Sequence, residues 1–449
     1  MKPYGNLHSL ILKPTRILNS TSVVFTMLAA ALGVVVMFAG STFAAERVIY
    51  NFQGGNDGIG SNDLIADRAG NLYGTTFNGG GSAGAGTVYE LSPPAQPGGV
   101  WTENILYSFS YTALNSGIGP LGRLVMDSAS NLYGTTWLGG PQGAGVAFEL
   151  SPPAVKGGAW TYSLLYAFGG AGLSSPEVGL VLDKAGNLYG TTASGGTGGC
   201  AGGCGGVFKL APPAQAGAAW TETVLFNFSG SFNTGGGTSG GLTTDARGSL
   251  YGTTYSGSGG PSGTVFRLTP KGQQWVHTVL YAFAGGSDGA FPQAEVVFDK
   301  HGNLYGMTNY GGTGGPNCFG SPCGTVFELM PAPTGPWMHS VLYSFNGGTD
   351  GGYPGRALTL DAGGNLYGTT GIGGDPSCAG GNGDGCGTVF QLAAPTSRGG
   401  PWTETILHRF AGGADGVGPG GLTLGGGGFL YGPAAGGAHN EGLVFSSAR

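Results

Sequence analysis

One short motif recurs along almost the whole chain and limits the possible fold more than any other feature. The segment Asn71-Leu72-Tyr73-Gly74-Thr75-Thr76 returns in closely similar form, and a weaker copy ends at Gly432. The motif tyrosines lie 54 to 64 residues apart: Tyr73, Tyr133, Tyr189, Tyr251, Tyr305, Tyr367 and Tyr431. Repeats of this spacing predict seven copies of one structural unit, which together fill the chain after about residue 46.

Each repeat predicts four β-strands. An apolar segment that ends in Asp, such as Leu180-Val181-Leu182-Asp183, leads through an Asp-x-x-Gly-Asn turn into the motif. Gly fits the left-handed position of this turn and the Asp carboxylate can accept backbone N–H groups across it, so the two segments form a hairpin. A Gly-rich loop then leads to a third strand of alternating polarity, such as residues 324–329. A Pro-containing connector precedes an outer strand with a tryptophan and a Leu-Tyr-x-Phe-like signature.

The two ends of the chain complete each other. The last repeat has three strands, around residues 422–424, 429–432 and 443–445, whereas residues 47–52 carry an outer-strand signature ahead of the first full repeat. We therefore predict an all-β, seven-bladed β-propeller with four antiparallel strands per blade, in which residues 47–52 complete the last blade. A linear solenoid would need distinct capping repeats, and the sequence has none.

Composition agrees with an all-β fold. Glycine accounts for 98 of 449 residues, without the Gly-X-Y period of collagen, and aromatic residues reach 11%, too many for a disordered polar linker. At this glycine content, Gly-spaced motifs arise by chance. The Gly-x-Ser-x-Gly pattern at 237–241 lacks the strand–turn–helix context of a hydrolase nucleophile, so we assign it no catalytic role.

The first 45 residues differ from the rest. Lys2, Lys13 and Arg16 precede an apolar run from 23 to 40, and small residues follow, which is typical of a secretory signal peptide. An uncleaved membrane anchor is the alternative, because a run of this length can just cross a bilayer. Removal of residues 1–45 would shift the net charge from −6 to −9, which makes nucleic acid an unfavourable partner. We expect an exported monomer whose single propeller domain covers 46–449.

The six cysteines form three closely spaced pairs, each in a loop between the second and third strands: Cys200 and Cys204, Cys318 and Cys323, Cys378 and Cys386. In an oxidising compartment, a local disulfide is a simple way to hold a Gly-rich loop. Thiolate metal sites are the alternative, but no histidine lies near these pairs in the sequence. We predict three disulfides, one within each loop.

Residues that break the repeat are candidates for a ligand site. An Asp-Gly turn recurs in loops that lead from an outer strand to the next inner strand, at Asp57, Asp288, Asp350 and Asp415. Asp followed by Gly commonly makes a turn, but carboxylates also suit Ca²⁺ and sugar hydroxyls. The charged residues just before or within inner strands, which we predict to line the mouth of the central channel, are Arg123, Glu177, Glu295 and Arg356.

Other aromatic and histidine residues receive structural interpretations. The motif tyrosines and the third-strand aromatics recur in every blade, so we expect them to pack between blades. His277 and His339 replace a Glu or another polar residue near the start of an outer strand, where we expect them to be solvated.

The three linked elements Asn-Leu-Tyr-Gly-Thr-Thr, Gly-Thr-Val-Phe-Glu-Leu and Leu-Tyr-Ser-Phe resemble the GloVer tandem repeat of bacterial exported proteins with a choice of C-terminal anchors. The resemblance covers about residues 47–446. It implies an exported repeat protein and no catalytic residues, and this sequence departs from anchored members because it has no recognisable C-terminal sorting segment.

These observations favour a non-enzymatic binding or interaction scaffold, secreted, periplasmic or on the cell surface, with a carbohydrate, peptide or protein ligand on the loop face. One alternative is a lyase or hydrolase acting on an extracellular polysaccharide or lactone, with a metal at the channel mouth and residues such as Glu295 and Arg356. The other is a purely structural surface protein, which would have a flat face without a concave polar site.

Overall fold

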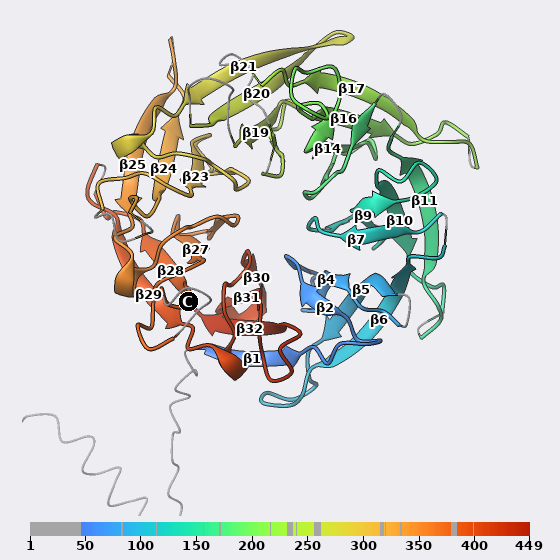
Figure 1. Ribbon diagram of the computed structural model, residues 1–449, viewed down its shortest axis with the longest axis horizontal. Coiled ribbons are helices and arrows are strands. Elements are labelled where there is room, and N and C mark those ends of the chain that lie inside the picture. The colour runs from blue at the N-terminus through green and yellow to red at the C-terminus, as the bar shows by residue number, and fades with distance from the viewer. Residues whose placement is uncertain are drawn as a thin grey trace, which may run out of the picture. The chain divides into compact units, whose positions relative to one another are not determined.

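Seven antiparallel sheets, each with four main strands, are arranged in a ring in the part of the chain that follows residue 45 (Figure 1). Each sheet is one repeat, and we number these blades 1 to 7 in chain order. The predicted seven-bladed β-propeller is therefore confirmed. The computed structural model describes residues 46–449 except 82–83, 114, 156, 170–171, 216, 231–236, 239, 256–261, 315–317, 319, 333–334, 379–383 and 398. The predicted signal peptide and Ser239 of the Gly-x-Ser-x-Gly pattern lie outside the described residues.

The strands follow the predicted order in every blade. From blade 1 to blade 7, the inner strands are β3 (Ile65–Ala66), β8 (Val125–Met126), β13 (Val181–Leu182), β18 (Thr243–Thr244), β22 (Val297–Phe298), β26 (Thr359–Leu360) and β30 (Thr423–Leu424). The second strands are β4 (Leu72–Asn78), β9 (Leu132–Gly139), β14 (Leu188–Thr192), β19 (Leu250–Thr254), β23 (Leu304–Thr308), β27 (Leu366–Thr370) and β31 (Phe429–Ala434).

The third strands are β5 (Gly84–Ser92), β10 (Val146–Ser151), β16 (Gly206–Ala211), β20 (Thr264–Lys271), β24 (Thr325–Met330), β28 (Thr388–Ala393) and β32 (Leu443–Ala448). The outer strands are β6 (Thr102–Ser110), β11 (Thr161–Ala167), β17 (Thr221–Asn227), β21 (Gln274–Ala282), β25 (Met338–Ser344), β29 (Thr403–Arg409) and β1 (Glu46–Asn51). Short extra strands are β2 (Ile59–Ser61), β7 (Gly117–Pro120), β12 (Leu173–Ser174) and β15 (Ser194–Gly195). The 3₁₀ turns are η1 (Gly286–Asp288), η2 (Gly348–Asp350), η3 (Gly413–Asp415) and η4 (Gly426–Gly428). Within the described part, no helix is long and apolar enough to cross a membrane.

The ring closes as predicted, because β1 pairs antiparallel with β32 of blade 7, with Val48 opposite Phe445 (Figure 1). The last blade thus combines three strands from one end of the chain with one strand from the other. This pairing covers strand edges that would otherwise be open to other chains.

The repeated motif is explained by packing. In blades 1 to 6 an Asp holds the inner hairpin turn: in blade 1, Asp67 Oδ1 accepts the N–H groups of Ala69 and Asn71 at 2.8 and 2.9 Å, and its Oδ2 accepts the Tyr73 hydroxyl at 3.2 Å. The motif glycine leaves room for the third-strand ring, since a Cβ on Gly306 would lie 2.5 Å from Phe327 Cζ. In blades 1, 2, 4 and 6 the first motif threonine bonds to a carbonyl of the next blade, as Thr369 does to Gly420 at 2.9 Å.

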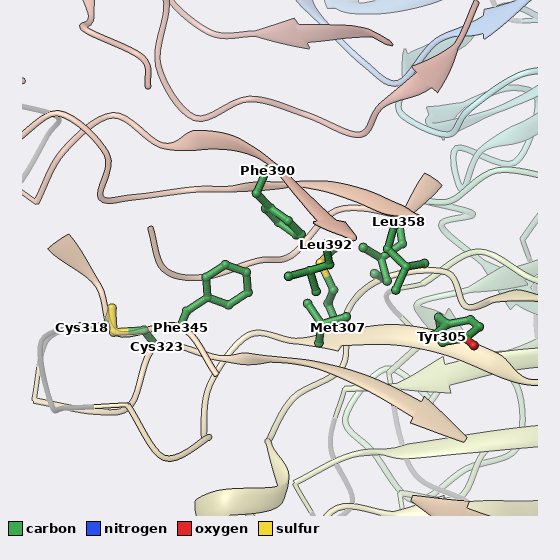
Figure 2. Close-up of a cluster of buried hydrophobic side chains, with 11 residues drawn as sticks. Tyr305, Met307, Cys318, Cys323, Phe345, Leu358, Phe390 and Leu392 are labelled. Atoms are coloured by element: carbon green, nitrogen blue, oxygen red, sulfur yellow. A yellow bond between two sulfur atoms is a disulfide. The ribbon is translucent and has the colours of Figure 1, made fainter. Parts of the chain in front are cut away.

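Aromatic residues join neighbouring blades, as the repeat predicts. Six motif tyrosines pack against the outer-strand tryptophan of the next blade, with ring centroids 5.6 to 6.5 Å apart. Each outer-strand signature Phe meets the third-strand ring of the next blade edge to face, at 5.0 to 5.3 Å. Figure 2 shows one such core, in which Phe345 lies between the Cys318–Cys323 disulfide and Phe390. Since the repeated residues are used in packing, a ligand site has to come from residues that do not repeat.

Candidate functional site

One face of the propeller carries both sets of long loops. The loops between second and third strands bond to the segments that lead into the inner strands: the N–H groups of Gly80, Gly312 and Gly374 donate to the carbonyls of Gly55, Gly286 and Gly348 at 2.7 to 2.8 Å. We call this the loop face. The chain enters every inner strand from the loop face, so the residues just before these strands form the channel mouth there.

Two aromatic residues at this mouth have a strained backbone. At the equivalent position of each lead-in segment the chain takes a left-handed conformation, with Gly in four blades (Gly60, Gly119, Gly237 and Gly418) and Ser175 in blade 3. Blades 5 and 6 instead place Phe291 and Tyr353 there, at φ of 58° and 55°. A bulky side chain is costly in this region, on the order of 1–3 kcal/mol, and such strain is concentrated at functional sites.

These two rings belong to a row of four that follows the mouth from blade 4 to blade 6. The centroids of Tyr255 and Phe291 are 4.9 Å apart, those of Phe291 and Tyr310 are 5.7 Å apart, and those of Tyr310 and Tyr353 are 4.8 Å apart. All four rings are half-buried, so each keeps some surface open to solvent. We call Tyr255, Phe291, Tyr310 and Tyr353 the aromatic row. A second pair, Phe77 and Trp137, lies at the mouth of blades 1 and 2.

Polar side chains lie among these rings. The amide oxygens of Gln293 and Asn309 both approach Gly355 of the lead-in segment of blade 6. Glu177, a predicted mouth residue, bonds to the side chain of Trp137; burial raises the pKa of its carboxyl above the ordinary value, and this bond offsets part of the rise. The mouth therefore combines flat apolar rings with amide and carboxyl groups.

Three charged residues occupy equivalent positions, two residues before the inner strands of their blades: Asp63, Arg123 and Glu295. The structure brings two of them together, with Arg123 of blade 2 and Glu295 of blade 5 forming an ion pair at 3.3 Å. Burial raises the pKa of the Glu295 carboxyl, and the Arg123 charge opposes that rise. Asp63, which sequence reasoning missed, accepts the Gly421 N–H at 2.7 Å. Arg356, which sequence analysis named together with Glu295 for the enzyme alternative, lies three residues before β26 and is exposed. The arginine that pairs with Glu295 is Arg123.

A cavity of ≈ 310 Å³ lies inside the channel next to Arg123, lined by the inner strands of blades 5 to 7, including Val297, Thr359 and Thr423. A second cavity, of ≈ 730 Å³, opens near the hairpin turn of blade 4, where the lining residues Tyr251 and Trp337 form one of the repeated packing pairs. The first of these two cavities is lined by a charged residue that breaks the repeat, Arg123.

The three predicted disulfides are present, within the loops of blades 3, 5 and 6: Cys200–Cys204, Cys318–Cys323 and Cys378–Cys386. Each holds the lead-in segment of the next blade. Cys204, Cys323 and Cys386 accept through their carbonyls the N–H groups of Gly237, Tyr353 and Gly418. The Cys318 carbonyl also accepts the Tyr353 hydroxyl at 3.2 Å. The disulfide of blade 5 therefore supports a ring of the aromatic row.

The four Asp-Gly carboxylates are used inside their turns. Asp350 accepts the Asn346 N–H at 3.0 Å and the hydroxyl of the outer-strand Tyr343 at 3.1 Å. Asp57 and Asp288 make the corresponding bonds to Tyr50 and Tyr281, and Asp415 makes them to Ala411 and His408. These bonds place the carboxylates against the outer strands, and a Ca²⁺ role for them stays a prediction.

Between consecutive blades, one outer-strand residue faces the signature aromatic of the preceding blade. We call this the junction position; it holds Glu46, Glu103, Tyr162, Glu222, His277, His339 and Glu404. Glu103 bonds to the Tyr50 hydroxyl at 3.0 Å, and Glu404 bonds to the Tyr343 hydroxyl at 3.0 Å. Burial, with Asp57 beside it, raises the pKa of Glu103 to about 9, and burial raises the pKa of Glu404 to about 7.

The two junction histidines differ from expectation. His277 stacks on Phe226 at 4.2 Å and His339 stacks on Tyr281 at 4.2 Å, and both are half-buried instead of solvated. The twist of the propeller turns this edge of each outer strand toward the preceding blade. Burial lowers the pKa of His277 to about 4, so its imidazole stays neutral.

The aromatic row was not predicted from the sequence. A signal was available, because an aromatic residue directly precedes Pro292 and Pro354 at the place where other copies have Gly or Ser. Comparison of the seven copies position by position would have shown that these two blades differ.

Comparison with solved structures finds weak similarities to proteins of several kinds. The chain is similar to PorZ, an essential bacterial surface component of the type-IX secretion system of Porphyromonas gingivalis, at 14% identity and a TM-score of 0.47, over 88% of this chain and 46% of PorZ. The chain thus spans about half the length of PorZ. It is similar to a putative 6-phosphogluconolactonase from Bacteroides uniformis, at 12% identity and a TM-score of 0.48, over 85% of this chain and 94% of that one. A third similarity is to the PQQ-bound aldose sugar dehydrogenase of Streptomyces coelicolor, at 10% identity and a TM-score of 0.41, over 89% of this chain and 97% of the dehydrogenase.

No curated protein matches the chain. A family model, described as the Gloeobacter/Verrucomicrobia repeat, matches residues 26–200 and 155–382. These matches cover most of the chain and include six of the seven repeated motifs, which confirms the resemblance drawn from the sequence. The chain belongs to the Gloeobacter/Verrucomicrobia repeat family.

Proposed function

We propose that this protein is an exported, non-enzymatic binding protein that holds a carbohydrate at the channel mouth of its loop face. The observation that carries the proposal is the aromatic row, in which Phe291 and Tyr353 keep large rings at left-handed backbone positions that other blades fill with Gly or Ser. Packing alone does not require these rings, because four blades close the same contact with Gly. The strain is instead consistent with a surface selected for a ligand.

The chemistry of the mouth suits a sugar. The C–H faces of a pyranose pack flat on aromatic rings, and its hydroxyls need partners that both donate and accept, as the amides of Gln293 and Asn309 do. Binding sites of this kind combine apolar walls with a few polar groups that fix orientation. The row extends over three neighbouring blades, which suits an oligosaccharide better than a single sugar unit.

Export is supported by the disulfides, since bridges of this kind persist in oxidising compartments. We propose that residues 1–45 act as the export signal and are removed. The intact mass of the exported protein tests this, and a mass that includes the apolar run would indicate an anchor instead.

The carbohydrate proposal predicts a selective loss of binding in Phe291→Gly and Tyr353→Gly. An exported sample is screened on a glycan array, and the best oligosaccharide is titrated calorimetrically. Each variant should bind about tenfold more weakly, because one ring–ligand contact contributes on the order of 1 kcal/mol. Stability should change by no more than about 1 kcal/mol, because relief of strain offsets lost packing.

Phe429→Ala is the matched control, since this half-buried ring lies beside the hairpin turn of blade 7, on the opposite face. It should leave glycan affinity unchanged. Unaltered affinity in both glycine variants, or no glycan bound by the wild type, would refute the proposal.

Removal of one disulfide should have a second, distinct effect. The double variant Cys318→Ser with Cys323→Ser loses about 2 kcal/mol of stability by the chain-entropy estimate for so short a loop, and it also loosens Tyr353. In the wild type, the loop closed by Cys200 and Cys204 contacts Gly237, which has no ring. The corresponding double variant of these two cysteines should therefore lose similar stability but keep its glycan affinity. Equal loss of affinity in both variants would contradict a role for Tyr353.

A further inference from the structure

The junction between blades 6 and 7 has a chemistry of its own. In blades 5 and 7 the signature residue that meets the junction glutamate is a tyrosine, Tyr343 or Tyr50, whereas blade 6 carries His408. His408 Nε2 lies 3.2 Å from Asp415 Oδ2 and 3.9 Å from Glu46 Oε2. An imidazole nitrogen therefore stands where the other junctions that contain a glutamate have a phenol oxygen.

Glu46 lacks the hydrogen bond that the other junction glutamates receive. Glu103, Glu222 and Glu404 each bond to a tyrosine hydroxyl at 2.8 to 3.0 Å. The distance of 3.9 Å from Glu46 to His408 is too long for a hydrogen bond. Glu46 Oε1 is buried without a partner among the described residues, as Oε1 is in the other three junction glutamates, so the missing tyrosine bond is what sets Glu46 apart. The Glu46 side chain is only 10% exposed. A carboxyl buried in this way is either protonated or lies beside a positive group, and a bound cation would supply that group here.

The donor atoms are arranged to share one ion. One atom from each of Glu46, His408 and Asp415 lies within 4.8 Å of the other two. A zinc ion holds N and O donors at about 2.0–2.2 Å, so a small contraction of the cluster would satisfy all three. Asp415 is held by the Ala411 N–H and by its place in η3, and its side chain is 25% exposed, which leaves a path from solvent.

We propose that Glu46, His408 and Asp415 bind a divalent transition-metal ion of the Zn²⁺ class at the ring-closing junction. One imidazole and two carboxylates suit such an ion, whereas Ca²⁺ is held by oxygen donors. Two acidic groups beside one imidazole also give the cluster the negative charge that a cation offsets. Water would complete the coordination.

The ion would join three parts of the chain: β1, which closes the ring, β29 of blade 6, and the η3 turn that leads into blade 7. All three meet only in the folded ring, so the ion binds the folded state in preference to the unfolded one. Its binding energy therefore adds to the stability of the closed propeller. The aromatic row lies elsewhere, so this proposal is independent of carbohydrate binding.

The test uses the full chain, oxidised, stripped of metal with a chelator, and titrated with ZnCl₂ by calorimetry. The wild type should bind one equivalent, and the melting temperature should rise with free Zn²⁺. His408→Tyr restores the residue that blades 5 and 7 use, so it should fold normally, lose the bound equivalent and show no rise in melting temperature. Glu46→Gln should bind at least tenfold more weakly.

A variant that gains a second site is a useful control, because misfolding could explain a loss of zinc binding but not a gain. Tyr343→His recreates the same three donors with Asp350 and Glu404 between blades 5 and 6, so it should bind a second equivalent of Zn²⁺. Unchanged stoichiometry in His408→Tyr would mean that the zinc sits at other surface groups and would overturn the proposal. Absence of saturable binding by the wild type would overturn it as well.

Discussion

Phe52→Ala will lower the free energy of unfolding by about 3–5 kcal/mol, the usual cost of removing a large buried ring. Phe52 is fully buried, and it meets Tyr89 edge to face at 5.2 Å. The contact joins the strand that closes the ring to blade 1, so the cavity weakens the closure itself. Urea unfolding followed by tryptophan fluorescence measures the change.

Tyr111→Ala serves as the control, because its side chain is 56% exposed and its removal should change stability by less than about 0.5 kcal/mol. A loss below about 1 kcal/mol in Phe52→Ala would mean that the ring closure contributes little to stability.

The melting temperature of the wild type will fall as pH rises from 6 to 9.5. A tyrosine hydroxyl has one hydrogen, yet the Tyr50 hydroxyl lies 2.7 Å from Asp57 and 3.0 Å from Glu103, so one carboxyl has to carry a second proton. Because the folded-state pKa of Glu103 is raised to about 9, its contribution to stability is complete below about 4.5 and is lost as pH rises through 9. The contribution of Glu404 to stability is likewise lost as pH rises, because the pKa of its carboxyl in the folded state is raised to about 7.

Glu103→Gln and Glu404→Gln should flatten this pH dependence, since an amide donates as the protonated acid does and cannot ionise. Combined, they should remove most of the loss that the wild type shows by differential scanning calorimetry. Glu441→Gln, a half-buried change on the loop face, should leave the curve as in the wild type. A parallel fall in the double variant and the wild type would assign the pH dependence to other groups.

The fold could be predicted because the residues that build it are the ones that repeat. Motif tyrosines such as Tyr73 pack against outer-strand tryptophans of the next blade, such as Trp160. The same packing contact therefore recurs from blade to blade, and its residues recur in the sequence. The ring closure followed from the same rule, since residues 47–52 repeat an outer strand that blade 7 lacks.

The candidate site could be predicted only in part. Arg123 and Glu295 stood out because they break the repeat, but their pairing joins residues 172 positions apart and depends on how far the ring brings opposite blades together. Phe291 and Tyr353 were missed because their importance lies in backbone conformation, which becomes visible only when their φ values are compared with those of the equivalent glycines. His277 and His339 were expected to be solvated because the pattern of one strand does not reveal the neighbouring blade.

Because the last blade combines β1 with β32, the ring can close only after both strands have been synthesised. Arg47 and Ser446 are in contact across 399 positions of sequence, so β1 is synthesised long before its partner strand exists. Until β32 arrives, the nascent chain has an unpaired strand at each end of a growing array, and neither the Phe52 contact nor the Glu46 junction can form. Chains that end early remain open, with exposed edges that proteases and other chains can reach. Synthesis of β32 therefore decides whether the preceding six blades can close into a ring.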